Sequence, residues 1–79
     1  MKENGHKKIE VGMTIAYFSS WGQGSRRETS VVEIELCENE GDKYGVEVNE
    51  VWIKDIQRAV FTLSDGHWCY GWQIDEVLG

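Results

Sequence analysis

The sequence predicts a small all-β protein: a five-stranded, partly open antiparallel barrel with one short helical turn. Four of the five strand segments alternate apolar with polar residues, which is the period of a half-buried strand. Clusters of glycine, serine, asparagine and aspartate separate these segments, as tight turns require. A chain of 79 residues holds one domain, and curling its sheet into a barrel protects strand edges that an open meander exposes.

The first strand is predicted over residues 9–18. Alternation there places three side chains on one face, those of Met13, Ile15 and Tyr17. Gly12 lies within this strand and is expected to bend or bulge it. The residues before it are polar and charged, so we expect a flexible N-terminal segment over 1–8 and the barrel domain over 9–79.

The longest loop is predicted over residues 19–28, which contain two glycines and three serines without periodicity. The clearest strand follows over 30–38, with apolar side chains toward the core and glutamates toward solvent. The inward set is Val32, Ile34 and Leu36, and the outward set is Glu33 and Glu35. A short turn then leads to a strand over 44–48, in which Val46 and Val48 are expected to face the core.

The second half of the chain predicts a hairpin and a closing turn. Residues 50–57 fit either a continued strand or a short helical turn, and the sequence leaves both open. Alternation returns over 58–63, and the Asp-Gly dipeptide that follows is a strong hairpin signal. The return strand over 68–72 places three aromatic rings on one face, those of Trp68, Tyr70 and Trp72. Residues 73–78 are expected to end the chain as a turn or a single helical turn.

The predicted domain opens with a pattern like I-x-V-G-x-x-V-x-Y, formed by Ile9, Val11, Gly12, Ile15 and Tyr17. A long loop follows the first strand, and a tight hairpin and a short helical turn end the chain. This layout resembles small SH3-like barrels of the Tudor and KOW kind. Tudor modules bind methylated side chains in an aromatic cage, so the resemblance implies a binding function. The ending D-G-H-W-x-Y-G-x-Q-I also resembles small accessory proteins encoded by bacteriophages.

The net charge of −6 is concentrated in the middle of the chain, where residues 28–55 hold nine acidic and two basic residues. A field of this sign repels nucleic acid. Alternate glutamates on a strand lie about 7 Å apart, a spacing similar to that of phosphates, so the acidic run also fits a nucleic-acid mimic. The other interpretation is the solvent face of an amphipathic hairpin. The run comprises Glu33, Glu35, Glu38, Glu40, Asp42, Glu47, Glu50 and Asp55.

The two cysteines, Cys37 and Cys69, are expected to be free thiols. The N-terminus has no apolar signal region, and no stretch reaches the ~18 apolar residues of a membrane span. We therefore predict a cytoplasmic protein with reduced cysteines and no membrane association.

Catalysis and metal binding are not expected. His67 and Cys69 alternate after Asp65, but Cβ atoms ~7 Å apart on one strand are too distant for a nucleophile and its base. His67, Cys69 and Cys37 together offer three soft metal ligands, whereas a structural zinc site requires four ligands. We expect no catalytic centre, no metal and no cofactor.

Large aromatic residues are the best candidates for binding. A core of this size is expected to hold two of the four tryptophans, which leaves the others exposed as anchors. Trp21 is favoured because it lies in the longest loop beside Arg26 and Arg27, which could meet phosphate or carboxylate groups. Trp21 could equally fold back to cap the open end of the barrel. The predicted binding residues are Trp21, Arg26, Arg27, Glu33, Glu35, Trp52, Trp68 and Trp72.

These patterns favour a non-catalytic binding module, a phage-encoded protein that docks on and modulates a host protein. Two alternatives stay open. One is an acidic nucleic-acid mimic that occupies a basic groove, and the other is a structural subunit that completes its core by self-association. The expected partner is a protein or, in the last alternative, a second copy of the chain. Direct binding to DNA is not expected.

Overall fold

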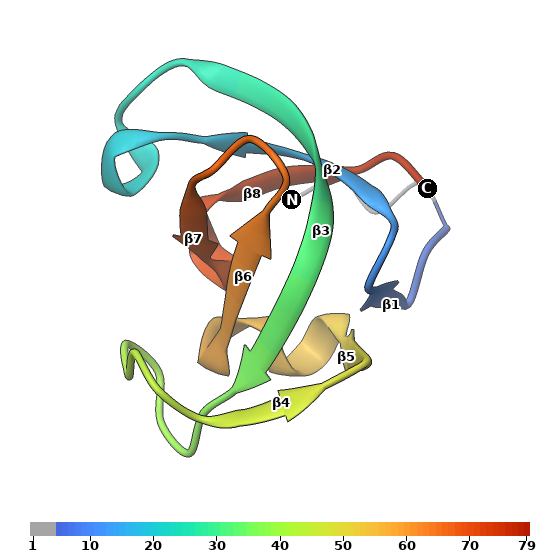
Figure 1. Ribbon diagram of the computed structural model, residues 1–79, viewed down its shortest axis with the longest axis vertical. Helices are drawn as coiled ribbons and strands as arrows, with labels where there is room; N and C mark the ends of the chain where they lie inside the picture. The colour runs from blue at the N-terminus through green and yellow to red at the C-terminus, as the bar shows by residue number, and fades with distance from the viewer. Residues whose placement is uncertain (1–4) are drawn as a thin grey trace.

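The computed structural model describes residues 5–79, which form a mostly β structure with short 3-10 turns (Figure 1). The elements in chain order are β1 (Lys8–Glu10), β2 (Thr14–Phe18), η1 (Ser20–Gly22), β3 (Arg26–Leu36), β4 (Val46–Val48), β5 (Glu50–Trp52), η2 (Ile53–Arg58), β6 (Ala59–Leu63), β7 (Trp68–Tyr70), η3 (Gly71–Gln73) and β8 (Ile74–Val77). None of the helical elements in this region is long and apolar enough to cross a membrane. The predicted all-β class is confirmed.

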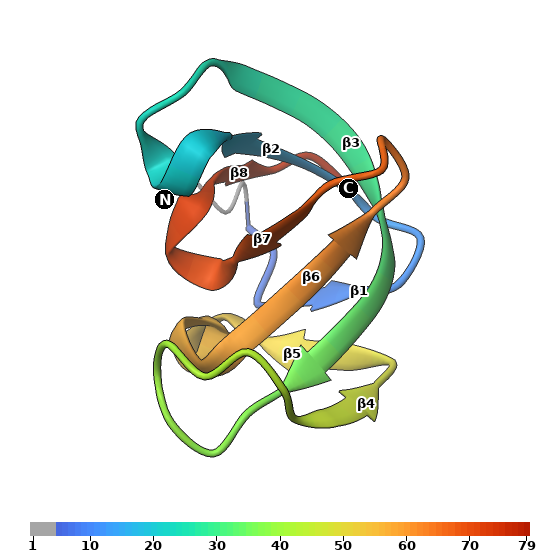
Figure 2. The ribbon, with the colours of Figure 1, turned by 60° about the vertical axis from the view of Figure 1, so that its left-hand side comes forward.

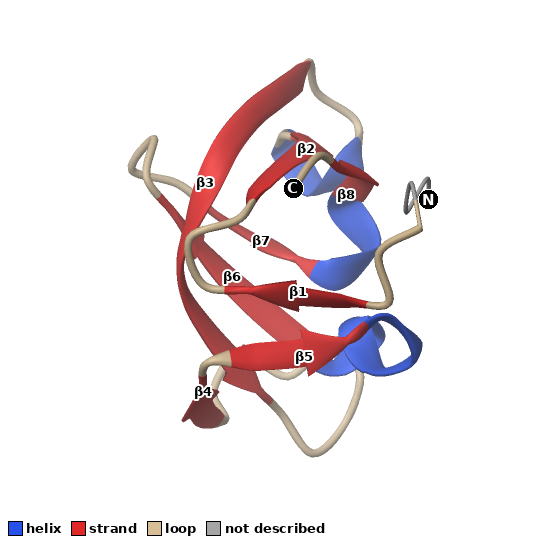
Figure 3. Ribbon diagram, turned by 90° about the vertical axis from the view of Figure 1, so that its right-hand side faces the viewer, coloured by secondary structure: helices blue, strands red, loops and turns tan. Residues whose placement is uncertain are grey.

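Six strands form one antiparallel sheet. In it β7, β6, β3, β2 and β8 lie side by side in that order, and β4 pairs with the far end of β3. β1 and β5 form a separate two-stranded ladder (Figure 3). The outer strands β7 and β8 are not paired with each other, so within residues 5–79 the sheet is not closed. These residues divide into eight strands rather than the five predicted.

β3 is long and strongly curved, and it joins the two halves of the sheet (Figure 2). Its first half pairs with β2, and its second half pairs with β6 and β4. The register with β6 shifts between Val31 and Glu33, and this bulge turns Val32 outward, where it is 52% exposed. The prediction that Val32 faces the core is therefore wrong. A bulge inserts one residue and breaks the alternation, so Val31 and Ile34 are the buried residues instead.

Two further departures from the predicted strands have local causes. Gly12 has a φ of +98°, which glycine adopts without steric cost, and it divides the predicted first strand into β1 and β2. Val46 is 72% exposed, although the alternation predicts a core position. β4 is an edge strand paired with β3, and only its last residue, Val48, packs partly against the core.

The ambiguous segment over 50–57 contains both predicted structures, because β5 is followed directly by η2. β5 pairs with β1, which brings the N-terminal residues into the fold. Lys8 lies opposite Trp52, and Ile53 N donates to Lys7 O at 2.9 Å. Lys7 and Lys8 therefore take part in backbone pairing with this segment. Residues 1–4 lie outside the described residues.

The core is filled by branched aliphatic side chains and by the fully buried rings of Tyr17 and Phe61. Both cysteines are buried and free, as predicted. None of the four tryptophans is buried, since their exposed fractions range from 41% for Trp68 to 62% for Trp21. The expectation that two tryptophans fill the core is wrong, because the aliphatic residues and these two smaller rings already occupy its space.

Candidate binding site

Three exposed tryptophans from two distant parts of the chain surround a tyrosine, Tyr70, that is only 6% exposed. Trp68 and Tyr70 share one face of β7 because alternate residues of a strand point the same way, while Cys69 between them is buried in the core. The Trp68 and Tyr70 ring centroids are 5.2 Å apart, and Trp72 of η3 stacks on Tyr70 at 4.2 Å. Trp21 of η1 lies 5.8 Å from both Trp68 and Tyr70. We call Trp21, Trp68, Tyr70 and Trp72 the aromatic surface.

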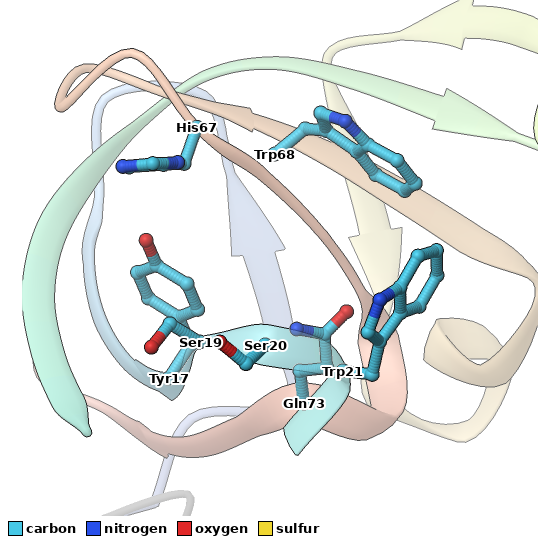
Figure 4. Close-up of a pocket in the computed structure, with 7 residues that line it drawn as sticks. All are labelled: Tyr17, Ser19, Ser20, Trp21, His67, Trp68 and Gln73. Carbon is cyan, nitrogen blue, oxygen red and sulfur yellow. The ribbon is translucent and has the colours of Figure 1, made fainter. Parts of the chain in front are cut away.

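A cavity of about 170 Å³ adjoins this surface and is here called the aromatic pocket (Figure 4). Its lining comes from β2, the loop that contains η1, the β6–β7 turn, β7 and η3, and consists of Tyr17, Ser19, Ser20, Trp21, His67, Trp68 and Gln73. The volume suits the end of one side chain. An apolar cavity of ~150 Å³ holds benzene, whereas pockets for drug-sized molecules begin at ~300 Å³.

A second cavity of about 300 Å³ shares two wall residues, His67 and Trp68, with the aromatic pocket. Lys43 also lines it, and its Nζ lies 5.3 Å from the centroid of the Trp68 ring. An ammonium group at this distance is attracted by the negative face of the indole. The Trp68 ring is therefore in contact with the Lys43 ammonium group at the second cavity.

A left-handed turn presents Trp21. Ser20 and Trp21 have φ values of +52° and +62°, and Gly22 follows at +92°. The N–H groups of Gly22 and Gly24 both donate to Ser19 O and hold the turn. Positive φ costs a residue with a Cβ of order 1–3 kcal/mol, and such conformations cluster at functional sites. The turn therefore favours a role for Trp21 as a presented side chain.

Gln73 joins two parts of the sheet beneath the aromatic pocket. Its side chain is buried, its Nε2 donates to Phe18 O at 3.0 Å, and its Oε1 accepts from Tyr70 N at 2.9 Å. Phe18 ends β2 and Tyr70 ends β7, so one amide links strands that lie on opposite sides of β3. This link fixes η3, which carries Trp72, against the loop that carries Trp21.

Tyr17 forms the wall opposite the tryptophans. Its hydroxyl donates to Asp65 Oδ2 at 2.8 Å, and Asp65 Oδ1 accepts from His67 N at 3.0 Å. Burial, and next the hydrogen bond to Asp65, raise the pKa of Tyr17 to about 12. The phenol therefore keeps its proton at neutral pH and directs it at the carboxylate.

Three of the predicted binding residues, Trp21, Trp68 and Trp72, come together in the aromatic surface. Trp52 lies apart from them on β5, with Lys8 Nζ 5.8 Å from its ring. The eight predicted residues therefore do not form one site.

The predicted arginines and glutamates lie along β3. Arg26 is ion-paired at 2.9–3.0 Å with three carboxylates of the chain, those of Glu28, Asp75 and Glu76. Arg27 is directly opposite Tyr17 in the β2–β3 ladder. Glu33 and Glu35 lie in the second half of β3, where Glu35 faces Glu47 and lines the second cavity.

The sequence interpretation missed the polar residues of the pocket: Ser19, Ser20 and Gln73. It also assigned Tyr17 to the core without its hydroxyl partner. One signal was present, because a buried tyrosine hydroxyl needs a hydrogen-bond partner. The acceptor is Asp65, 48 residues away in the chain, and no sequence spacing indicates that pairing.

Asp65, His67 and Cys69 alternate in the sequence, but they do not form a site with a reactive thiol. Cys69 is buried, and burial followed by the charge of Asp65 raises its pKa to about 12, whereas reactive cysteines have lowered pKa values. Over residues 5–79, no group of three or more histidine, cysteine, aspartate and glutamate side chains is placed to hold a metal ion.

Comparison with known proteins finds no matching family model, no matching curated protein and no matching solved structure.

Proposed function

We propose that this protein is a non-catalytic protein-binding module that docks on its partner through the aromatic surface. The observation that carries the proposal is the exposure of three neighbouring tryptophan rings, 62% for Trp21, 41% for Trp68 and 43% for Trp72. Contiguous exposed apolar patches mark interaction sites. Tryptophan and tyrosine are also enriched among the few residues that dominate binding energy.

Packing alone does not account for Trp21. A large aromatic ring stabilises a fold by burying roughly 150–250 Å², yet Trp21 keeps most of its surface exposed on a strained turn. Its contacts with Trp68 and Tyr70 cover part of the residue and leave 62% of it exposed. The remaining surface is available to a partner, which favours docking over the capping role.

An SH3-like barrel is the finer fold that we propose for the same chain. Support comes from the strand order β7-β6-β3-β2-β8, from the curved β3 shared by both halves, and from η3 between the last two strands. In this scheme β4, β5 and η2 are an insertion between β3 and β6. The aromatic surface then lies where the long loop approaches the final hairpin.

The partner in this proposal is a protein. The resemblance of the C-terminal motif to phage accessory proteins would make it a host protein whose activity the docking modulates. The raised pKa of the buried Cys69 thiol argues against this cysteine as a nucleophile.

Alanine variants of single tryptophans test the proposal. The tagged chain captures its partner from a bacterial lysate, mass spectrometry identifies it, and calorimetry measures its affinity for each variant. Trp21→Ala and Trp72→Ala should each lose ~2 kcal/mol or more of affinity, about thirtyfold in Kd, at a melting temperature close to that of the wild type. Trp52→Ala is the control, because Trp52 is comparably exposed but lies apart. Full affinity in Trp21→Ala and Trp72→Ala, or an equal loss in Trp52→Ala, would contradict the proposal.

A second candidate, the acidic mimic, is favoured by one observation. Glu35 lies directly opposite Glu47 in the β3–β4 ladder. Like charges in directly opposed positions destabilise a sheet, and a basic groove would relieve that repulsion. In this case Glu35→Gln with Glu47→Gln should raise the melting temperature and weaken the captured complex, whereas an unchanged complex would exclude the mimic.

A further inference from the structure

We propose that the aromatic pocket binds one neutral sugar ring, a pyranose of the glucose type. A sugar site goes beyond the proposed function, because the ring would occupy the pocket, whereas the protein partner contacts the exposed aromatic surface beside it. Three features of the pocket support this ligand: the mixed hydrogen-bonding character of its lining, the charges of both signs around it, and its aromatic walls.

The lining offers hydrogen-bond donors and acceptors together. Gln73 Nε2 donates one of its two hydrogens to Phe18 O, which leaves the second N–H as a donor. The Tyr17 hydroxyl donates its hydrogen to Asp65 Oδ2, so its oxygen remains an acceptor. Ser20 Oγ both donates and accepts, and the two indoles that line the pocket each carry an N–H donor.

A ligand that fills such a pocket has to donate and to accept hydrogen bonds. An apolar side chain would displace water and leave the polar groups of the lining without partners, at a cost for each of them. Carboxylates only accept, whereas guanidinium and ammonium groups only donate. Each hydroxyl of a sugar does both, as the hydroxyl of serine does. An amide side chain also does both, but it brings few C–H groups to two indole walls.

Charged side chains of both signs lie beside the pocket. Asp65 accepts from the Tyr17 hydroxyl, and Arg27 is directly opposite Tyr17 in the β2–β3 ladder. Lys43 contacts the Trp68 ring from the second cavity. The seven described residues that line the pocket include none of these three charged residues. A cation or an anion would each meet a like charge nearby, so a neutral ligand fits these surroundings best.

The aromatic walls suit the C–H faces of a pyranose. Trp21 and Trp68 are perpendicular, with centroids 5.8 Å apart, so one indole can cover a face of the ring while the other covers its edge. In Figure 4 the rings of Tyr17 and His67 lie across the pocket from these two indoles. A glucose-type ring carries hydroxyls around its rim and C–H bonds on both faces, which pack against aromatic surface through dispersion. An apolar cavity of ~150 Å³ holds benzene, so about 170 Å³ admits one six-membered ring.

The η1 turn brings a hydroxyl and an indole to the pocket side by side. Ser20 and Trp21 are consecutive, both have positive φ, and both line the pocket. Consecutive residues of a strand would point to opposite faces, whereas the left-handed turn places both side chains at one cavity. The pair therefore supplies a polar and an apolar contact at the same edge of a bound ring.

Titration of the whole chain with small polyols, without the captured partner, tests this ligand. The probe is methyl β-D-glucopyranoside. Of two matched controls, sorbitol keeps the hydroxyls but has no ring, and cyclohexanol keeps a six-membered ring with a single hydroxyl. Binding is followed through the indole N–H resonances of Trp21 and Trp68, with that of Trp52 as the reference. The glucoside should bind with a Kd of about 1–10 mM, at least about tenfold more tightly than either control.

Two variants test the assigned contacts. Trp21→Ala should weaken binding of the glucoside at least about tenfold, and Ser20→Ala should weaken it about threefold to tenfold through the lost hydrogen bond. Both variants should melt close to the wild type, because both residues are exposed. Trp52→Ala is the control and should bind the glucoside as the wild type does, because Trp52 lies apart on β5.

Three results would overturn the sugar site. They are equal binding of sorbitol or cyclohexanol, no shift of either pocket indole at about 50 mM glucoside, and full binding of the glucoside by Trp21→Ala. If the glucoside fails to bind while Trp21→Ala still loses the captured protein, docking through the aromatic surface stands and only the sugar ligand falls.

Discussion

Removing the Gln73 amide should cost this protein much of its stability. In Gln73→Ala, the Tyr70 N–H and the Phe18 carbonyl both lose their side-chain partner. An unsatisfied buried donor or acceptor costs ~1–3 kcal/mol, so the two together cost roughly 2–6 kcal/mol. A domain of this size has only ~3–5 kcal/mol of net stability from its core. At ~4–8 °C per kcal/mol, the melting temperature should fall by at least about 8 °C.

Gln73→Glu sharpens the test, because its effect depends on pH. A carboxylate accepts from Tyr70 N but repels the Phe18 carbonyl, whereas a carboxylic acid accepts from one and donates to the other. The folded state therefore raises the pKa of the introduced acid above the ~4.3 of an unfolded glutamate. The stability that Gln73→Glu recovers relative to Gln73→Ala should be fully present below pH ~4.3. It should be lost as the pH rises through the folded-state pKa of the introduced acid.

Urea unfolding followed by tryptophan fluorescence measures these effects at several pH values, always relative to the wild type at the same pH. Gln57→Ala is the matched control, because Gln57 is exposed on η2 and should change stability by less than ~0.5 kcal/mol. A Gln73→Ala variant as stable as that control, or a Gln73→Glu variant without recovery in acid, would refute the role of the amide.

Three further predictions follow from buried groups. Gly71→Ala should destabilise by ~3 kcal/mol or more, because a Cβ at Gly71 would overlap the backbone oxygen of Ile56, and thermal unfolding measures this. Stability should fall between pH ~10 and the Tyr17 pKa of about 12, because only the unfolded state loses that proton in this window, and alkaline unfolding curves of wild type and Tyr17→Phe will show it. Cys69, with its thiol pKa raised to about 12, should resist alkylation at pH 8 until the chain unfolds, which mass spectrometry can follow.

Each of these predictions has a control. Gly41 has open space around its Cβ position but a φ of +84°, so Gly41→Ala should cost only ~1 kcal/mol and separates crowding from backbone strain. Asp65→Asn removes the carboxylate that accepts from Tyr17, so the alkaline transition should move to lower pH. If Cys69 is alkylated equally fast in native and urea-unfolded protein, its burial is refuted.

The strands were predictable where the chain obeys a local period. The alternation over 30–38 and 58–63 corresponds to β3 and β6, and the glycine at position 12 marks the break between β1 and β2. The orientation of Val32 was not predictable, because the bulge that turns it outward depends on the register with β6. The site was predictable in part. The spacing of Trp68 and Tyr70 places them on one face of a strand, but nothing local indicates that Trp21 meets them.

The sequence by itself determined the all-β class, the positions of most turns, and an aromatic-rich, acidic surface, because these follow from period, turn chemistry and composition. Only the tertiary structure decided which aromatic rings are covered and which residues share a pocket. The Tyr17–Asp65 and Gln73–Phe18 hydrogen bonds join residues 48 and 55 positions apart. Such contacts depend on the curvature and order of the whole sheet, and neither quantity is encoded within any single segment.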